Sequence, residues 1–122
     1  MADPQLDQDL KKAFQDLQTL MLESTQKMKI SEMQIEQLKG TIKREKLTQE
    51  EINGLEPETK TYESIGRMFL QQPMDIILGN IEEKIRAAEV KVKTIEGNKK
   101  HLEGKIQEHQ NNIREMVATR HK

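Results

Sequence analysis

The sequence contains no cysteine and no tryptophan, and its aromatic residues are Phe14, Tyr62 and Phe69 alone. Without cysteine the chain has no disulfide, no thiolate nucleophile and no cysteine-ligated metal. A globular domain of 122 residues would normally bury more large apolar side chains than this sequence offers, since 34% of it is hydrophobic and 34% charged. The composition therefore favours an elongated helical protein.

Long apolar runs are also missing. No uninterrupted stretch approaches the roughly 20 residues needed to cross a bilayer, and the acidic N-terminus lacks the apolar region of a signal peptide. The formal net charge of −1 gives no reason to expect strong binding to nucleic acid. We therefore expect a cytoplasmic protein with neither a membrane nor a nucleic acid as partner.

Residue groups that support catalysis are absent as well. His101 and His109 are too far apart along a helix for the usual spacing of metal ligands. His109 is better explained as a polar residue in a contact between helices than as a metal ligand. The sequence has no glycine-rich phosphate loop and no Ser-His-Asp pattern. We predict no enzyme activity, no catalytic residue, no cofactor and no metal site.

Two long stretches instead repeat apolar residues at alternating four- and three-residue spacing, which is typical of a coiled coil. They predict helices over residues 4–46 and 73–120, with Asp3 as N-cap of the first and Pro73 opening the second. A capping-box pattern from Thr48 to Glu51 predicts a separate short helix over residues 48–55. The two seams are Leu10, Phe14, Leu17, Met21, Ser24, Met28, Ser31, Ile35, Leu38, Ile42, and Met74, Leu78, Ile81, Ile85, Ala88, Val92, Ile95, Lys99, Leu102, Ile106, His109, Ile113, Met116, Arg120.

The two seams can be docked as an antiparallel pair. The favoured register places Leu17 opposite Ile106 and the small Ser24 opposite Lys99. A shift by one heptad places Lys99 opposite Ser31 or opposite Leu17. The pairing with Leu17 is disfavoured because it buries an amine against a large apolar side chain.

The insert between the helices predicts a β-hairpin over residues 59–71, with Gly66 supplying the positive φ of a tight turn. Alternation places apolar side chains on both faces of this hairpin, and two strands leave both edges unpaired. We therefore expect the hairpin to pair with hairpins from other chains.

The free end of the predicted helix pair carries flexible apolar residues that could adapt to varied partners, although ordinary packing at a helix end explains them equally well. These residues are Leu6, Leu10, Ile113, Met116 and Val117. The basic residues nearby, among them Lys99, Lys100 and Arg114, are better explained by the helix dipole and by acidic neighbours than by an anionic partner.

The segment 58–70 resembles the hairpin signature of the β-class subunits of prefoldin, with a tyrosine, an apolar-glycine pair and an apolar strand after it. Segments 10–14, 34–38 and 112–116 extend the resemblance over nearly the whole chain. It implies a mainly α fold, an antiparallel two-helix coiled coil with a central hairpin that joins a β-barrel between subunits. It also assigns subunit assembly to Tyr62, Ile65, Gly66, Met68, Phe69 and Leu70.

The same resemblance implies a single subunit over residues 1–122 in a heterohexamer of two α-class and four β-class subunits. The family captures unfolded proteins, notably actin and tubulin, and delivers them to the cytosolic group II chaperonin without using ATP. Its partners would be other prefoldin subunits, unfolded clients and that chaperonin. The alternative is a structural coiled-coil adaptor that recognises one folded protein, but a helix-only adaptor would not need the hairpin.

Overall fold

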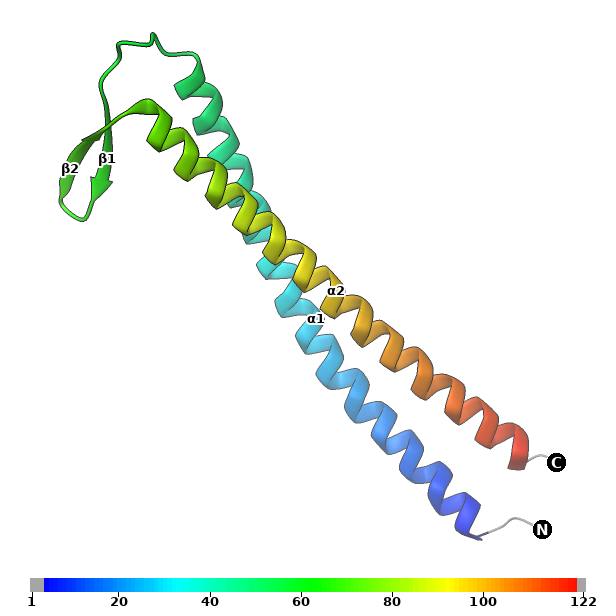
Figure 1. Cartoon of the computed structure of the whole chain (residues 1–122). Helices are drawn as coiled ribbons and strands as arrows, with labels where there is room; N and C mark the ends of the chain where they lie inside the picture. The colour runs from blue at the N-terminus through cyan, green and yellow to red at the C-terminus, as the bar shows by residue number, and fades with distance from the viewer. Residues whose placement is uncertain (1–3, 121–122) are drawn as a thin grey trace. The chain divides into compact units, whose positions relative to one another are not determined.

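The computed structural model describes residues 4–120 and consists of two long helices with a two-stranded antiparallel sheet between them (Figure 1). Helix α1 spans Pro4–Asn53, strand β1 Thr61–Ile65, strand β2 Met68–Gln72 and helix α2 Met74–Arg120. The predicted fold class, a mainly helical chain with one central hairpin, is confirmed. Asp3, the predicted N-cap of α1, lies outside the described residues.

Helix α1 continues without a break through the residues where the sequence predicts an end at 46 and a new helix at 48. That prediction is wrong. Thr48 does not cap a helix, because its hydroxyl donates a hydrogen bond of 3.0 Å to the backbone oxygen of Arg44, one turn earlier in the same helix. A threonine inside a helix can satisfy its hydroxyl in this way, so the capping-box pattern misled the interpretation.

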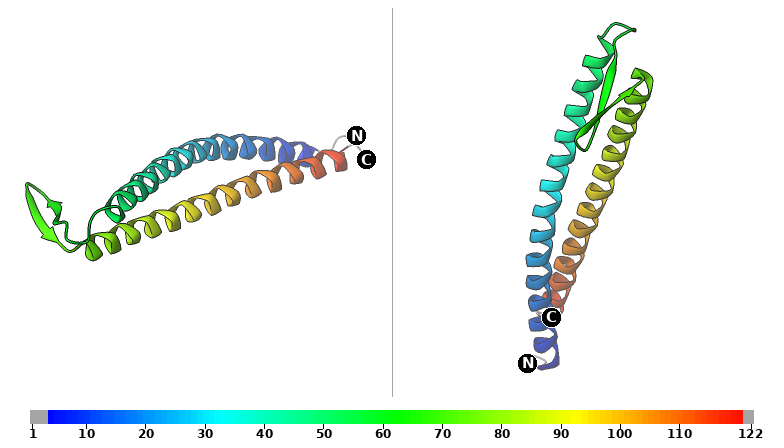
Figure 2. Two further views of the ribbon diagram at one scale, coloured as in Figure 1. Left: turned by 90° about the horizontal axis from the view of Figure 1, so that it is seen from above. Right: turned by 90° about the vertical axis from the view of Figure 1, so that its left-hand side faces the viewer.

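The chain divides into two compact units, each containing part of both helices. The course of the two helices can be followed from two further sides in Figure 2. One unit, called the terminal unit below, is built from α1 up to Met33 and from α2 beginning at Ile95. The other, the hairpin unit, is Gln34–Thr94. In each unit the two helical segments run antiparallel. The terminal unit buries Leu10, Ser24 and Ile113, and the hairpin unit buries Ile35, Ile81, Ile85 and Ala88.

The register of the helix pair differs from the favoured prediction by one heptad. In the terminal unit the Nζ atom of Lys99 lies 3.6 Å from Oε1 of Glu32, next to Ser31 rather than Ser24. Leu17 lines a groove together with Ile113, not with Ile106. The structure thus has the alternative register in which Lys99 is opposite Ser31. Ser31 is as small as Ser24 and so accommodates the Lys99 side chain equally well, while Glu32 beside it supplies an opposite charge.

Burial in the terminal unit also departs from the heptad ladder. Along α1 the least exposed positions are Ala13, Leu17, Leu20, Ser24, Met28 and Ser31, and along α2 they are Leu102, Ile106, Gln110, Ile113 and Val117. Both series contain two successive four-residue steps, centred on Ser24 and on Ile106. Such a stutter locally unwinds a coiled coil. In the observed register the two stutters face each other.

The stutter moves three predicted seam residues out of the seam. Phe14 is 46% exposed and Met21 42% exposed, because the neighbouring residues Ala13 and Leu20 take the inward positions. His109 is exposed as well, and Gln110 is partly buried in its place. Ser24, at the centre of the stutter, is 1% exposed, so the seam has no room there for a larger side chain.

The hairpin turns over Gly66 and Arg67, with Ile65 paired to Met68 and Thr61 paired to Gln72. Gly66 has φ 60° and no other residue in the described part has positive φ, which matches a type II′ turn. The sequence prediction of a hairpin with Gly66 in its turn is confirmed, with strand bounds 61–65 and 68–72 inside or next to the expected range. Pro73 precedes α2, and its carbonyl accepts bonds from the Ile76 and Ile77 amides at 3.1 and 3.2 Å.

Candidate functional site: the hairpin and the groove of the terminal unit

The hairpin presents apolar side chains on both of its faces. The cross-strand pairs of the register share a face, so Ile65, Met68 and Leu70 lie on one side of the sheet. Tyr62 and Phe69 lie on the other side, together with Ser64 and Gln71. This arrangement follows from period-two alternation on a short sheet and agrees with the sequence prediction.

These apolar side chains are open to solvent in the single chain. Met68 and Phe69 are each 74% exposed, and Tyr62, Ile65 and Leu70 are about half exposed. Burying a large apolar side chain fully is worth about 1.5–3 kcal/mol. Burial of these side chains against a partner would therefore be strongly favourable, and within residues 4–120 no element covers either face of the hairpin. The structure places all six predicted assembly residues, including Gly66 in the turn, on this one hairpin.

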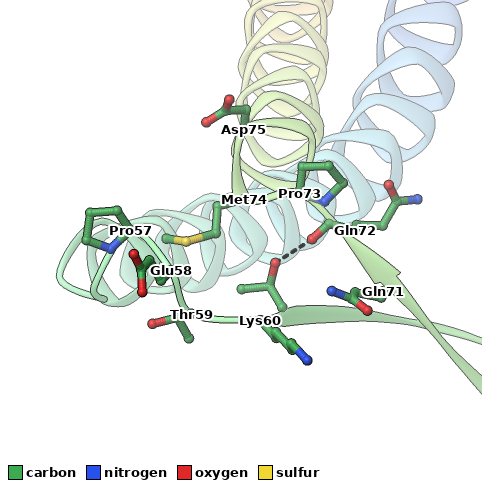
Figure 3. Close-up of a pocket in the computed structure, with 10 residues that line it drawn as sticks. Pro57, Glu58, Thr59, Lys60, Gln71, Gln72, Pro73, Met74 and Asp75 are labelled. Carbon is green, nitrogen blue, oxygen red and sulfur yellow. Dashed lines mark hydrogen bonds between the residues drawn. The ribbon is translucent and has the colours of Figure 1, made fainter.

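The base of the hairpin encloses a hollow of about 630 Å³ (Figure 3). Residues 57–61 form one side of it, and residues 71–75, from the end of β2 into the first turn of α2, form the other. The Thr61 hydroxyl donates a 2.6 Å hydrogen bond to the Gln72 carbonyl and ties the two strands together at this point. The lining is mostly polar, with Glu58, Lys60 and Asp75 as its charged residues. We interpret the hollow as a structural feature of the junction between the hairpin and α2.

In the part of the chain that the structure covers, no group of three or more histidine, aspartate or glutamate side chains could hold a metal ion. Among these same residues, neither long helix contains a stretch apolar enough to span a membrane. Between the described residues, the ion pairs Lys46–Glu89 at 4.0 Å and Lys99–Glu32 at 3.6 Å each link α1 to α2 within one unit. At this exposure such pairs contribute little, about 0–1 kcal/mol each.

The terminal unit carries a second candidate site, a groove of about 370 Å³. It is called the Ile113 groove below and is lined by Leu17 of α1 and by Gln110, Ile113, Arg114 and Val117 of α2. Of the residues predicted at the free end, Ile113 and Val117 line this groove. Leu10 and Ile113 are buried in the seam, and Leu6, Met116 and Val117 are partly buried.

Sequence reasoning missed Phe14 and Met21 as surface residues. It assigned both to the seam, whereas each is more than two fifths exposed. A usable signal was present, because Ala13 and Leu20 offer an equally regular apolar ladder one residue earlier. The small Ser24 marks the position where the two ladders join.

Comparison with known proteins agrees with this architecture. The family model described as "Prefoldin subunit" matches residues 15–120. Prefoldin subunit 1 of Homo sapiens is 44% identical over 120 residues, which is 98% of either chain. Prefoldin subunit 1 of Arabidopsis thaliana is 37% identical and covers 91% of this chain and 87% of its own.

A solved structure shares the fold. The crystal structure of the prefoldin beta subunit from Thermococcus strain KS-1 superimposes with a TM-score of 0.71, covers 94% of each chain and is 19% identical in sequence. The family model and the high-coverage relatives decide membership, and the solved structure adds the shared arrangement of helices and hairpin. The chain therefore belongs to the prefoldin family of chaperone subunits.

Proposed function

We propose that this chain is one subunit of a heterohexameric, ATP-independent co-chaperone in the cytoplasm, assembled with α-class and β-class prefoldin subunits. The complex captures unfolded proteins of the actin and tubulin class and transfers them to the group II chaperonin. In this proposal residues 1–122 act as a single subunit. The hairpin assembles the complex, and the terminal unit contacts clients.

The observation that carries the proposal is the exposure of apolar residues on both faces of the hairpin. Five large apolar side chains there are between 48% and 74% exposed. An isolated two-stranded hairpin is marginal in water, and both of its strand edges can pair with another chain. Pairing edge to edge with hairpins of other subunits would cover the faces and satisfy the edges together.

Capture of clients in this proposal depends on weak contacts that are repeated on several subunits. The groove in the terminal unit is open and its apolar residues are few, so each contact is shallow. Joining several such contacts in one complex raises the overall affinity through effective concentration while each contact still releases readily. A chaperone that must later release its client needs both a high overall affinity and individual contacts that dissociate readily.

Suppression of aggregation tests the proposal. The purified complex containing this chain is expected to keep a chemically denatured client soluble, measured by light scattering, in the absence of nucleotide. Deleting residues 1–10 together with 113–122 should abolish protection while leaving the complex assembled. Undiminished protection after this deletion would contradict capture by the terminal unit, and a complex that binds one folded partner but protects no client would support the adaptor function instead.

A further inference from the structure

Among the residues that line the Ile113 groove, the one charged side chain is the Arg114 guanidinium. We propose that the groove selects unfolded segments in which a large apolar side chain stands next to acidic residues. This inference rests on the proposed function, since it names the class of client segment that the terminal unit prefers. Two independent features carry it, the apolar surface that surrounds the groove and the sign of the charges beside it.

The apolar surface extends beyond the groove along α1. Leu17 lines the groove, and Phe14 and Met21 lie one turn before and one turn after it, so the three are surface neighbours on one helix face. Phe14 and Met21 are 46% and 42% exposed because the stutter turns them out of the seam. The volume of about 370 Å³ is at the low end of the range for binding pockets, about 300–1,000 Å³. It suits one or two large side chains of a bound chain.

The α2 side of the groove supplies an unpaired positive charge. Arg114 lines the groove and forms no ion pair with any residue of the described range, so the acidic neighbours expected from the sequence do not pair with it there. The acidic residues nearest to it in sequence, Glu108 and Glu115, fall on the other side of α2. At about 100° per residue they lie roughly 160–180° around the helix from the groove residue Val117.

On the α1 side, three of the four carboxylates in the first half of the helix point away from the groove. Asp9, Asp16 and Glu23 recur every seven residues and lie roughly 140–180° around the helix from Phe14. Lys11 lies on the same side of α1 as Phe14, and so does Asp7, which is two turns, roughly 10 Å, before Phe14 and farther from the groove than Lys11. In an antiparallel pair this side of α1 borders the side of α2 that carries Gln110, Arg114 and Val117. On the α2 side the carboxylate of Glu103 lies on the same side as Val117, but seven residues, roughly 10 Å, before Gln110. The residues that line the groove itself thus combine apolar side chains, one amide and one positive charge.

This chemistry fits an extended acidic and apolar segment. An apolar side chain of the segment would fill the groove above Ile113, and a neighbouring carboxylate would accept hydrogen bonds from the Arg114 guanidinium, whose planar fork matches it. The Gln110 amide can donate to a backbone carbonyl of the same segment, which is available only while that segment is unfolded. A basic segment of equal hydrophobicity would meet repulsion instead.

Two labelled, unstructured peptides test the inference against the native complex by fluorescence anisotropy. Both contain the same leucine and phenylalanine residues, flanked by glutamate in one peptide and by lysine in the other. The glutamate peptide should bind about two- to fivefold more tightly, the range expected for an exposed ion pair, and 1 M salt should remove most of the difference. Arg114→Glu should abolish or reverse the preference, while the matched control Lys105→Glu, on the far side of α2, should preserve it.

A double variant tests the apolar part separately. Phe14→Ser with Met21→Ser should weaken both peptides by the same factor and leave helicity unchanged, since neither side chain is buried. Equal binding of the two wild-type peptides, or a preference that survives Arg114→Glu, would overturn the inference. If the complex still suppresses aggregation in that case, the proposed function stands without the charge selection. If the complex suppresses no aggregation at all, the proposed function itself fails.

Discussion

Glycine has opposite consequences at different positions of this chain. Gly66 has φ 60°, which L side chains rarely adopt, although no atom would meet an added Cβ there. Gly97 and Gly104 lie inside α2 with ordinary helical backbone and with open space around them. The conformation of the backbone, not the space available, therefore decides what a methyl group does at each site.

Substituting alanine at these positions should separate the two cases. Gly66→Ala should destabilise the hairpin by about 1–2 kcal/mol, because the left-handed conformation crowds Cβ, and should lower the urea concentration at which the complex dissociates. Gly97→Ala and Gly104→Ala should each stabilise the chain by about 0.5–1 kcal/mol through improved helix propensity, measured by far-UV circular dichroism during thermal unfolding. Destabilisation by the two helix variants would contradict the open surroundings described here.

Ser24 is the residue on which the stutter most depends. Ser24→Leu would improve an ordinary heptad seam, but at a position that is 1% exposed it should overpack the core and cost about 1–3 kcal/mol. Ser31→Leu is the matched control, since Ser31 is also a serine of the predicted seam but is only partly buried. Equilibrium unfolding of the two variants should show a clear loss for Ser24 alone, and a gain of stability at Ser24 would refute the stutter.

At the scale of elements, the sequence predicts the two helices and the hairpin from periodicity and one glycine, and these predictions are confirmed. The errors concern the end of α1 and the register, and each has its own cause. The local capping pattern at Thr48 suggests a helix boundary, whereas α1 continues to Asn53 and the Thr48 hydroxyl bonds back to the Arg44 carbonyl within the helix. The register predicted from the sequence places the small Ser24 opposite Lys99, but Ser31, one heptad later, offers an equally small partner and Glu32 beside it pairs with Lys99.

Disulfide crosslinking tests the observed register directly, because the natural chain has no cysteine that could compete. Cysteines at Leu17 and Ile113, which line one groove, should crosslink readily under mild oxidation. The matched pair at Leu17 and Ile106 should crosslink poorly, since the Cα atoms of a disulfide lie within about 7 Å of each other. Preferential crosslinking of Leu17 to Ile106 would restore the register predicted from the sequence.

At the scale of the whole molecule, the sequence identifies the family because the hairpin signature stands between two heptad stretches. It places the six residues proposed for assembly on one hairpin, as the structure does. It does not locate the exposed apolar surface of the terminal unit, because assignment of Phe14 and Met21 to the seam assumes an unbroken heptad. The stutter depends on how two helices pack together, and neither helix reveals that packing when its pattern is considered alone.

The hairpin is the part of the molecule that we expect to mediate assembly with other subunits. Ile65→Asp with Phe69→Asp places a charge on each face of the hairpin, and these positions are 54% and 74% exposed in the single chain. The double variant should keep its helicity, since it disturbs neither helix, but burying a charge in the assembled sheet would be prohibitive. Circular dichroism of the free chain provides the control for folding.

Native mass spectrometry of the complex purified through a tag on this chain tests the central claim most directly, because it reports stoichiometry and partner identity together. We expect the wild-type chain in a hexamer of different prefoldin subunits, and the Ile65→Asp, Phe69→Asp variant as a free chain. A wild-type chain found alone or bound to one folded protein of another family would contradict the account, as would a variant that still enters the hexamer.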